Sequence, residues 1–167
     1  MRSDYSGAQV MALVALRFGI GWHFFYEGVA KLVNPHWTAA GYLEASQGFM
    51  SGFFLDLASN PSTLAFIDFL NVWGLILVGL GLMLGALTRS ATVFGILLLL
   101  LYYLATPPWP GLVYAIPAEG AYMIINKTLI ELAALFVTLF FPTGHIVGLD
   151  RLVRLRRVRD AAQESYA

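Results

Sequence analysis

Four long apolar segments, separated by short polar or proline-containing stretches, dominate the pattern of hydrophobic and polar positions along this chain. They cover residues 8–33, 63–87, 90–106 and 122–141. A helix of about 20 apolar residues crosses the roughly 30 Å of a bilayer's hydrocarbon core. The pattern therefore predicts an all-α, polytopic membrane protein, in which residues 1–167 form a single domain with a bundle of four spanning helices.

Proline and capping residues predict where these helices begin and end. Pro35 ends the first helix, because proline disfavours helical backbone in the residue before it. Pro107 and Pro142 end the third and fourth helices in the same way. Ser62 or Thr63 is expected to cap the first turn of the second.

The first and third loops, at one end of the predicted bundle, are long and aromatic. The first loop, 36–60, mixes aromatic and aliphatic side chains with acidic ones, which is typical of a short helix lying along the membrane interface. The third loop is rich in proline, and Trp109 and Tyr114 are expected to anchor it at the interface. We expect these two loops to lie together over the ends of the helices.

Positively charged residues outside the apolar segments lie at the opposite end of the predicted bundle. They are Arg2, Arg89, Arg151, Arg154, Arg156, Arg157 and Arg159. Because Lys and Arg concentrate in the cytoplasmic segments of membrane proteins, both termini are expected in the cytoplasm and the two long loops outside. The basic tail, 145–167, is interpreted as an anchor of this orientation rather than as a helix on the membrane surface.

The composition indicates that the chain folds in a lipid bilayer. Apolar residues make up 59% of the chain and charged residues 12%, against about a quarter in soluble proteins, and the mean hydropathy is +0.72. The formal net charge is zero, so nothing indicates nucleic-acid binding. Without cysteine, the chain has no disulfides, thiol redox chemistry, iron–sulfur ligation or covalent haem. The N-terminus lacks the features of a signal peptide, and the first span is expected to stay uncleaved.

The first span has one polar face. At 100° per residue, Arg17, His23, Glu27 and Lys31 fall within about a third of the helix circumference. His23, Glu27 and Lys31 are four residues apart, so each can contact the next. Ionisable side chains in a bilayer face a bundle interior, pair with one another or have a function. We interpret this face as the inner wall of a site.

Polar residues from the other spans come to a similar depth. They are Asp68 and Asn71 in the second span, Tyr102 in the third, and Asn126, Lys127 and Glu131 in the fourth. Arg17 lies about 9 Å deeper than His23 by helix rise, and its nearest acid in the chain is expected to be Glu131, unless a ligand or partner supplies one.

These charges could simply hold the bundle together. Glu27 could pair with Lys31, and Lys127 with Glu131, along their own helices. Polar contacts between membrane helices contribute only about 0.6 kcal/mol on average, which is little return for so many buried charges. A bound ligand or proton-coupled chemistry is therefore the favoured interpretation.

A quinone is the ligand that these residue types fit best. Haem needs two axial ligands and His23 is the only histidine within a span, while the carboxylates lack the spacing of a metal site, so neither haem nor metal is predicted. A quinone needs hydrogen bonds to its carbonyl oxygens, a proton-exchanging group and aromatic walls. His23 and Glu27 are the predicted catalytic, proton-exchanging residues. The predicted quinone- and substrate-binding residues are Arg17, Trp22, Lys31, Asp68, Asn71, Tyr102, Asn126, Lys127 and Glu131.

Much of the chain resembles the DoxX/DoxD family of small four-helix membrane proteins. The similar stretches are LRFGIGWHFFYEGVAKL, the turn at Arg89, NKTLIELAAL and FFPTGHIVGLDRL. A spaced pattern typical of that family is carried by Arg17, Gly21, Phe24, Gly28 and Lys31. DoxD-type members resemble the membrane subunit of a thiosulfate:quinone oxidoreductase. The resemblance implies the prokaryotic cytoplasmic (inner) membrane, a complex with other protein subunits, and an anionic substrate such as thiosulfate held by Lys31 and Lys127.

Three functions are open at this point. The chain is a membrane subunit of a quinone-linked oxidoreductase, or a non-catalytic accessory subunit of a larger respiratory or other membrane complex. In the second case its aromatic loops and the glycines of the second span would bind the partner. Those glycines are Gly74, Gly79, Gly81 and Gly85. A small-molecule or proton carrier is disfavoured, because unbroken helices without repeats give little scope for alternating access.

Overall fold

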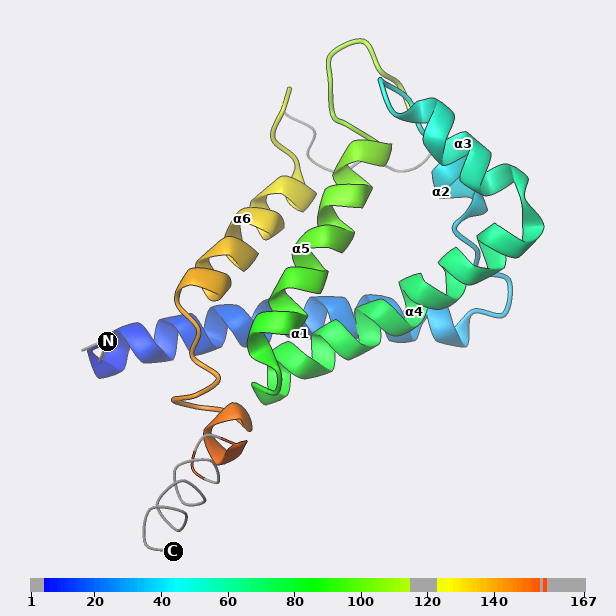
Figure 1. The fold of residues 1–167 in the computed structure, drawn as a ribbon. Helices are drawn as coiled ribbons and strands as arrows, with labels where there is room; N and C mark the ends of the chain where they lie inside the picture. Colours follow the sequence, from blue (N-terminus) through cyan, green and yellow to red (C-terminus); the bar gives the residue numbers. More distant parts are fainter. Residues whose placement is uncertain (1–4, 115–122, 154, 156–167) are drawn as a thin grey trace, which may run out of the picture.

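The computed structural model describes residues 5–114, 123–153 and 155, and this part of the chain forms helices and no β-strand (Figure 1). The helices are α1 (Gly7–Val33), α2 (Ala40–Glu44), α3 (Ser51–Ser59), α4 (Pro61–Leu84), α5 (Thr88–Ala105) and α6 (Lys127–Phe140). Among the described residues, α1, α4 and α5 are long and apolar enough to cross a membrane. The predicted all-α membrane fold is confirmed.

The second span has a different cap from the predicted one. The side chain of Asn60 accepts hydrogen bonds from the backbone N–H groups of Ser62 and Thr63, so α4 begins at Pro61. Asn60 fulfils the capping role that was expected of Ser62 or Thr63. The helix ends at Leu84 because the next residue, a glycine, adopts a left-handed backbone with φ of 64°.

The fourth span is shorter than predicted in the part that the structure describes. α6 has 14 residues, about 21 Å at 1.5 Å per residue, less than the hydrocarbon core of a bilayer. It begins at Lys127 because Asn126 is extended and its side chain accepts a hydrogen bond from Leu129 N. The predicted start at residue 122 lies outside the described residues, as do most of the basic tail and Arg2.

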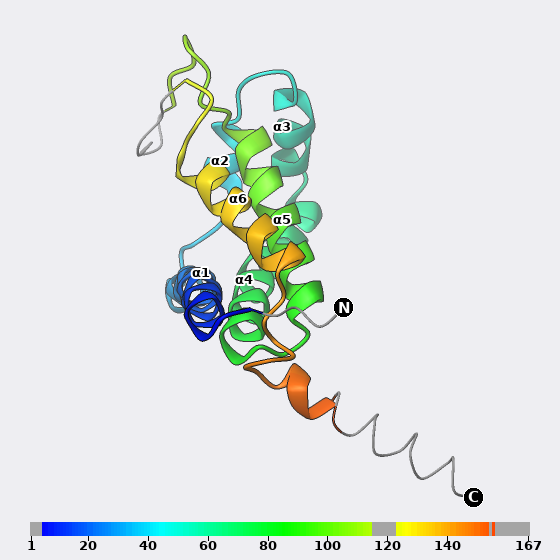
Figure 2. The ribbon, with the colours of Figure 1, turned by 90° about the vertical axis from the view of Figure 1, so that its left-hand side faces the viewer.

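The four longest helices, α1, α4, α5 and α6, form two crossed pairs. α1 packs most extensively on the antiparallel α4, and α5 on α6. Figure 2, which looks along α1, shows α5 and α6 side by side and running across that axis. α4 joins the two pairs, since it also packs on α5.

Glycines allow α1 and α4 to approach backbone to backbone. A Cβ at Gly79 of α4 would lie 2.5 Å from Phe25 N and 2.7 Å from Gly21 O, both on α1. A Cβ at Gly28 would lie 2.9 Å from Ile76 N. These contacts are possible only without a side chain, so the close packing expected of the second span's glycines is made largely within the chain itself.

The apolar core lies where the two pairs cross. Its most buried members are Phe24, Leu75, Val78, Leu82, Leu99 and Leu135. Large apolar side chains such as Phe18, Phe94 and Ile130 point outward and are exposed, as expected of a surface that faces lipid. Because lipid is as apolar as this core, close packing of the side chains is what favours helix association here.

The chain after α6 folds back onto the α4–α5 turn, which we call the turn end of the bundle. The carboxylate of Asp150 accepts hydrogen bonds from Leu87 N at 2.7 Å, Thr88 N at 3.0 Å and Thr88 Oγ1 at 2.7 Å. The first N–H groups of α5 have no partner within the helix, so this carboxylate caps it from a distant part of the sequence. Asp150 N donates in turn to Gly85 O at 2.9 Å.

Arg17 binds this same segment and not Glu131. Its Nη1 donates to Thr143 Oγ1 at 3.1 Å and its Nη2 to Val147 O at 2.8 Å. The side chain is buried, with 3% of its surface exposed. The expected contact with Glu131 is therefore wrong, because the folded-back segment brings its own oxygens to the guanidinium.

The opposite, loop end of the bundle carries two short helices, α2 and α3, where one was predicted (Figure 1). They pack on the end of α5 through Leu43, Phe54 and Ala105. The first and third loops contact each other as expected: the rings of Phe49 and Trp109 stack with centroids 5.8 Å apart. Residues 115–122 of the third loop lie outside the described residues.

Candidate functional site

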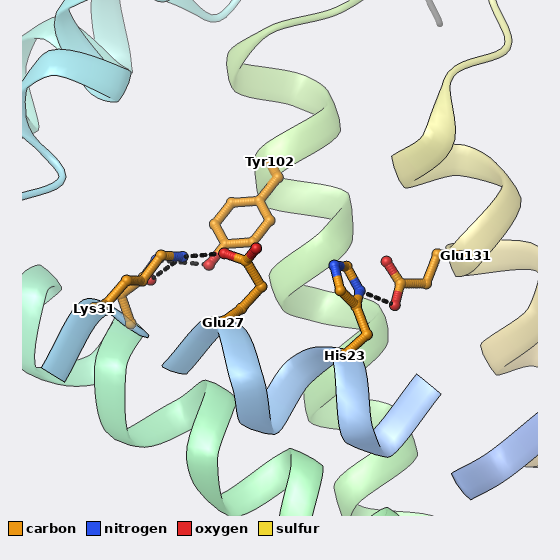
Figure 3. Close-up of polar contacts among 6 residues, drawn as sticks. His23, Glu27, Lys31, Tyr102 and Glu131 are labelled. Atoms are coloured by element: carbon orange, nitrogen blue, oxygen red, sulfur yellow. Dashed lines mark hydrogen bonds and ion pairs between the residues drawn. The ribbon is translucent and has the colours of Figure 1, made fainter. Parts of the chain in front are cut away.

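A polar cavity of about 360 Å³ lies between the helices toward the loop end. α1 contributes His23, Glu27 and Lys31, which stand on one face of the helix as their four-residue spacing predicts (Figure 3). Tyr102 comes from α5 and Glu131 from α6. We call this space the polar cavity.

Lys31 occupies one side of the polar cavity. Its Nζ donates to Asn71 Oδ1 at 3.2 Å and lies 3.8 Å from Glu27 Oε2. Asn71 Nδ2 donates onward to the hydroxyl of Tyr102 at 2.7 Å. The ammonium also lies 5.2 Å from the ring centroid of Trp37 and 5.6 Å from that of Tyr102, within cation–π range. These contacts fix a hydrogen-bonded cation against aromatic walls.

His23 and Glu131 form the other side of the polar cavity. His23 Nδ1 lies 2.7 Å from Glu131 Oε1, a contact that joins α1 to α6 (Figure 3). A carboxylate in this position orients the imidazole and stabilises its protonated form. Because Nδ1 is engaged, Nε2 is the ring nitrogen that remains for a ligand, and it has no hydrogen-bond partner among the described residues. The geometry leaves Nε2 as the ring nitrogen at which a ligand could be contacted.

The loop end covers the polar cavity with residues that sequence reasoning missed. Trp37, Thr38, Ala39 and Tyr42 line it, all from the start of the first loop. The hydroxyl of Tyr42 donates to Tyr102 O at 2.9 Å, and burial raises the pKa of Tyr42, so the phenol stays protonated near neutral pH. No local pattern marks these positions, because only the fold of the loop brings them over the helices.

An apolar groove of about 610 Å³ runs between α1 and α6 beside the polar cavity. Its apolar lining consists of Ala15, Leu16, Gly19, Ile20, Ile130 and Ala134. His23, Lys127 and Glu131 line both the groove and the polar cavity. The His23–Glu131 pair therefore stands at the boundary between a polar and an apolar space. We call the second space the α1–α6 groove.

The structure brings most of the predicted site residues together. Those that line the polar cavity are His23, Glu27, Lys31, Asn71, Tyr102, Lys127 and Glu131. Arg17 is at the turn end, and Trp22 is 52% exposed. Asp68 Oδ1 accepts from Ala39 N at 2.7 Å and so holds the first loop, while Asn126 caps α6. None of these four lines the polar cavity.

The residues that the structure describes contain no group of three or more His, Asp or Glu side chains arranged to hold a metal ion. Two of the basic side chains around the polar cavity have a side-chain partner there: Lys31 donates to Asn71, and His23 contacts Glu131. The arrangement suits hydrogen bonding to a polar ligand and transfer of a proton.

Three helices long and apolar enough to cross a membrane, with a polar cavity between them and α6, define an integral membrane protein. A family model described as DoxX matches residues 12–108, more than half of the chain, and the chain belongs to this family. DoxX is a membrane family often linked to oxidoreductase-related function. The matched range ends before α6 begins. Comparisons with curated proteins and with solved structures found no match.

Proposed function

We propose that the chain is the membrane subunit of a quinone-linked oxidoreductase and that the polar cavity binds the quinone head group. The observation that carries this proposal is the 2.7 Å contact between His23 Nδ1 and Glu131 Oε1 at the boundary of the polar cavity and the α1–α6 groove. A quinone has the same two-part character, a polar ring on an apolar tail. Reduction of the ring requires protons, which a paired imidazole supplies.

The head group has hydrogen-bond donors on two sides of the polar cavity. One carbonyl oxygen accepts from the Lys31 and Tyr102 side, where Asn71 holds both groups in place. The other accepts from His23 Nε2. When the quinone takes up electrons, protonated His23 gives its Nε2 proton to the ring oxygen and becomes a neutral imidazole; Glu131, at Nδ1, stabilises the imidazolium before the transfer and again when it is reprotonated from the outer side. Glu27 lies beside Lys31 and is the second group able to exchange protons.

The charge balance favours a neutral ligand in this cavity. Lys31 and Lys127 are matched by Glu27 and Glu131, so the formal charges of the lining cancel when His23 is neutral. An anion such as thiosulfate would find no excess of positive charge here. We place thiosulfate oxidation, or the oxidation of another reduced substrate, on a partner subunit, which passes the electrons to the quinone.

The proposed orientation has the polar cavity in the outer half of the prokaryotic cytoplasmic membrane. Arg89 and Arg151 lie exposed at the turn end, whereas the sequence holds no Lys or Arg in residues 34–60 or 106–126. The positive-inside rule then places the turn end and both termini in the cytoplasm. Quinone chemistry in the polar cavity would exchange protons with the outer side.

Trp37 gives a direct test, because it lines the polar cavity while Trp22, Trp73 and Trp109 do not. With these three changed to phenylalanine, the remaining tryptophan reports on a quinone bound next to it. We expect saturable quenching by a menaquinone or a ubiquinone, and a loss of affinity of about tenfold in His23→Ala, the cost of one charge-assisted hydrogen bond.

His145→Ala is the matched control, since His145 lies in the segment at the turn end. Its affinity should equal that of the parent protein. The assignment would be wrong if neither quinone quenched Trp37 saturably, or if His23→Ala and His145→Ala bound quinone equally well.

An accessory subunit of a larger membrane complex is the alternative. The glycines expected to bind its partner are largely unavailable, because Gly79, Gly81 and Gly85 already contact other parts of this chain. Purification from native membranes in a mild detergent distinguishes the two. Copurified quinone, identified by mass spectrometry, supports the oxidoreductase, whereas a stoichiometric large complex without quinone supports the accessory role.

A further inference from the structure

The α1–α6 groove exists because small residues face each other across it. Ala15 and Gly19 on α1 and Ala134 on α6 leave space that larger side chains would fill. A Cβ built on Gly19 meets no atom within 4 Å. From His23 to Ala15 the groove follows α1 for about 12 Å at 1.5 Å per residue, away from the loop end.

The groove is continuous in its lining with the polar cavity. His23, Lys127 and Glu131 line both spaces, and all polar side chains of the groove are these three. Beyond them the groove is lined only by apolar residues. A ligand that fills both spaces must therefore be polar at one end and apolar along the rest of its length.

We infer that the α1–α6 groove holds the first part of the isoprenoid tail of a membrane quinone whose head group lies in the polar cavity. This inference rests on the proposed function and adds a substrate class to it: the site selects tailed quinones from the bilayer over tailless ones. Ala15 and Gly19 are the specificity-determining residues. Their lack of side-chain bulk leaves room for the tail along α1 once it has passed the His23–Glu131 pair.

Lipid chains are as apolar as the tail, so transfer from lipid into the groove gives no hydrophobic gain. The tail is selected by its fit and by its covalent link to a bound head group. Filling the groove should therefore act as overpacking does, and weaken binding of a tailed quinone by about tenfold. Binding of a tailless head group should be unaffected.

The test uses the protein with Trp37 as its only tryptophan, and two pairs of ligands. Menadione and a menaquinone share a naphthoquinone head group, and tailless and tailed ubiquinone share a benzoquinone head group. Ala15→Leu and Gly19→Leu fill the groove independently. Ala133→Leu is the control, because Ala133 is exposed on α6 next to Ala134 but does not line the groove. Comparing each variant with its parent for one ligand at a time cancels partitioning of the ligand into the detergent.

We expect both groove variants to lose about tenfold in affinity for the tailed quinones and to keep that for the tailless ones within about twofold, with Ala133→Leu unchanged for all. The inference is overturned if the filled groove binds tailed quinones as the parent does while His23→Ala still lowers the affinity, a result that would assign the groove to lipid chains. It is also overturned if tailed and tailless ligands lose affinity equally. If no quinone quenches Trp37 at all, the proposed function itself fails.

Discussion

Replacing Gly79 with alanine tests whether the close contact of α1 and α4 positions the polar cavity. The new Cβ would lie 2.5 Å from Phe25 N and 2.7 Å from Gly21 O. Both are backbone atoms of α1, so no side-chain rotation relieves the overlap. The two helices must separate by about 0.9 Å to restore an ordinary contact of 3.4 Å.

The separation should alter both stability and the site. Overpacking of a closely packed interior typically costs about 1–3 kcal/mol in the free energy of unfolding. On the site, Lys31 of α1 donates to Asn71 of α4 at 3.2 Å, and a further separation approaching 0.9 Å takes the pair beyond hydrogen-bond distance. The ammonium would then lose the partner that orients it toward the ligand.

Gly74→Ala is the matched control, on the same helix. The Cβ at Gly74 would have Leu98 Cδ1 as its nearest neighbour, at 3.6 Å, an ordinary van der Waals distance. Alanine has a higher helix propensity than glycine by about 1 kcal/mol, and both substitutions gain this amount equally. The difference between the two variants therefore isolates the overpacking, and should be about 1–3 kcal/mol.

Equilibrium unfolding in mixed micelles, with increasing dodecyl sulfate and circular dichroism as the signal, measures that difference. Quenching of Trp37 by a menaquinone or a ubiquinone then shows whether the affinity for quinone falls in Gly79→Ala and stays constant in Gly74→Ala. Equal unfolding free energies for the two variants would refute the argument that backbone contact at Gly79 holds α1 in place. A lower stability with unchanged affinity would refute only its link to the site.

Two further predictions concern the turn end. Asp150→Ala should lower the free energy of unfolding by about 0.5–2 kcal/mol, as loss of a helix cap does. Burial alone would raise the pKa of Asp150, but hydrogen bonds from Thr88 and Leu87 outweigh it and lower the pKa in the folded protein below the usual 3.8. The stabilisation is therefore fully present above pH 3.8, and it is lost as the pH falls through the pKa of the folded protein. Unfolding curves of the two proteins should differ at neutral pH and converge in acid; a constant difference contradicts the assignment. Arg17→Lys should increase the rate of amide hydrogen exchange in residues 143–153, because one ammonium cannot reproduce the two directed bonds of the guanidinium. Arg89→Lys is the control, since Arg89 is exposed. Equal exchange rates in the two variants would show that Arg17 does not hold the segment.

Local signals in the sequence predict the helices well, because they act over a few residues. The first span runs over 8–33 by prediction and Gly7–Val33 in the structure, where Pro35 follows its end. The third differs by two residues at its start and one at its end. Prediction fails where several neighbouring residues could each cap a helix: Asn60 caps α4 in the structure, where Ser62 was an equally suitable candidate by residue type.

The candidate site could be predicted only as far as helix periodicity reaches. Spacing by four places His23, Glu27 and Lys31 on one face, and the structure has them there. Depth along the helix also groups Asp68 with them, but depth does not show direction, and this side chain binds the backbone of the first loop. Arg17 has partners from a segment 126 residues away, which no periodic pattern can reveal.

The spaced pattern by which the sequence resembles the DoxX/DoxD family lies more in the scaffold than in the site. It consists of Arg17, Gly21, Phe24, Gly28 and Lys31. In the structure the arginine holds the turn end, the two glycines receive the backbone of α4, and the phenylalanine lies in the core. The phenylalanine and the lysine also line the polar cavity, together with His23 and Glu27, which stand outside the pattern. The pattern thus accounts for the crossing of α1 and α4 more than for the polar residues of the cavity. The family match covers most of α1 and all of α4 and α5 but ends before α6, which supplies Lys127 and Glu131 to the polar cavity, so the role of this cavity has to be tested on His23, Glu27 and Glu131 themselves.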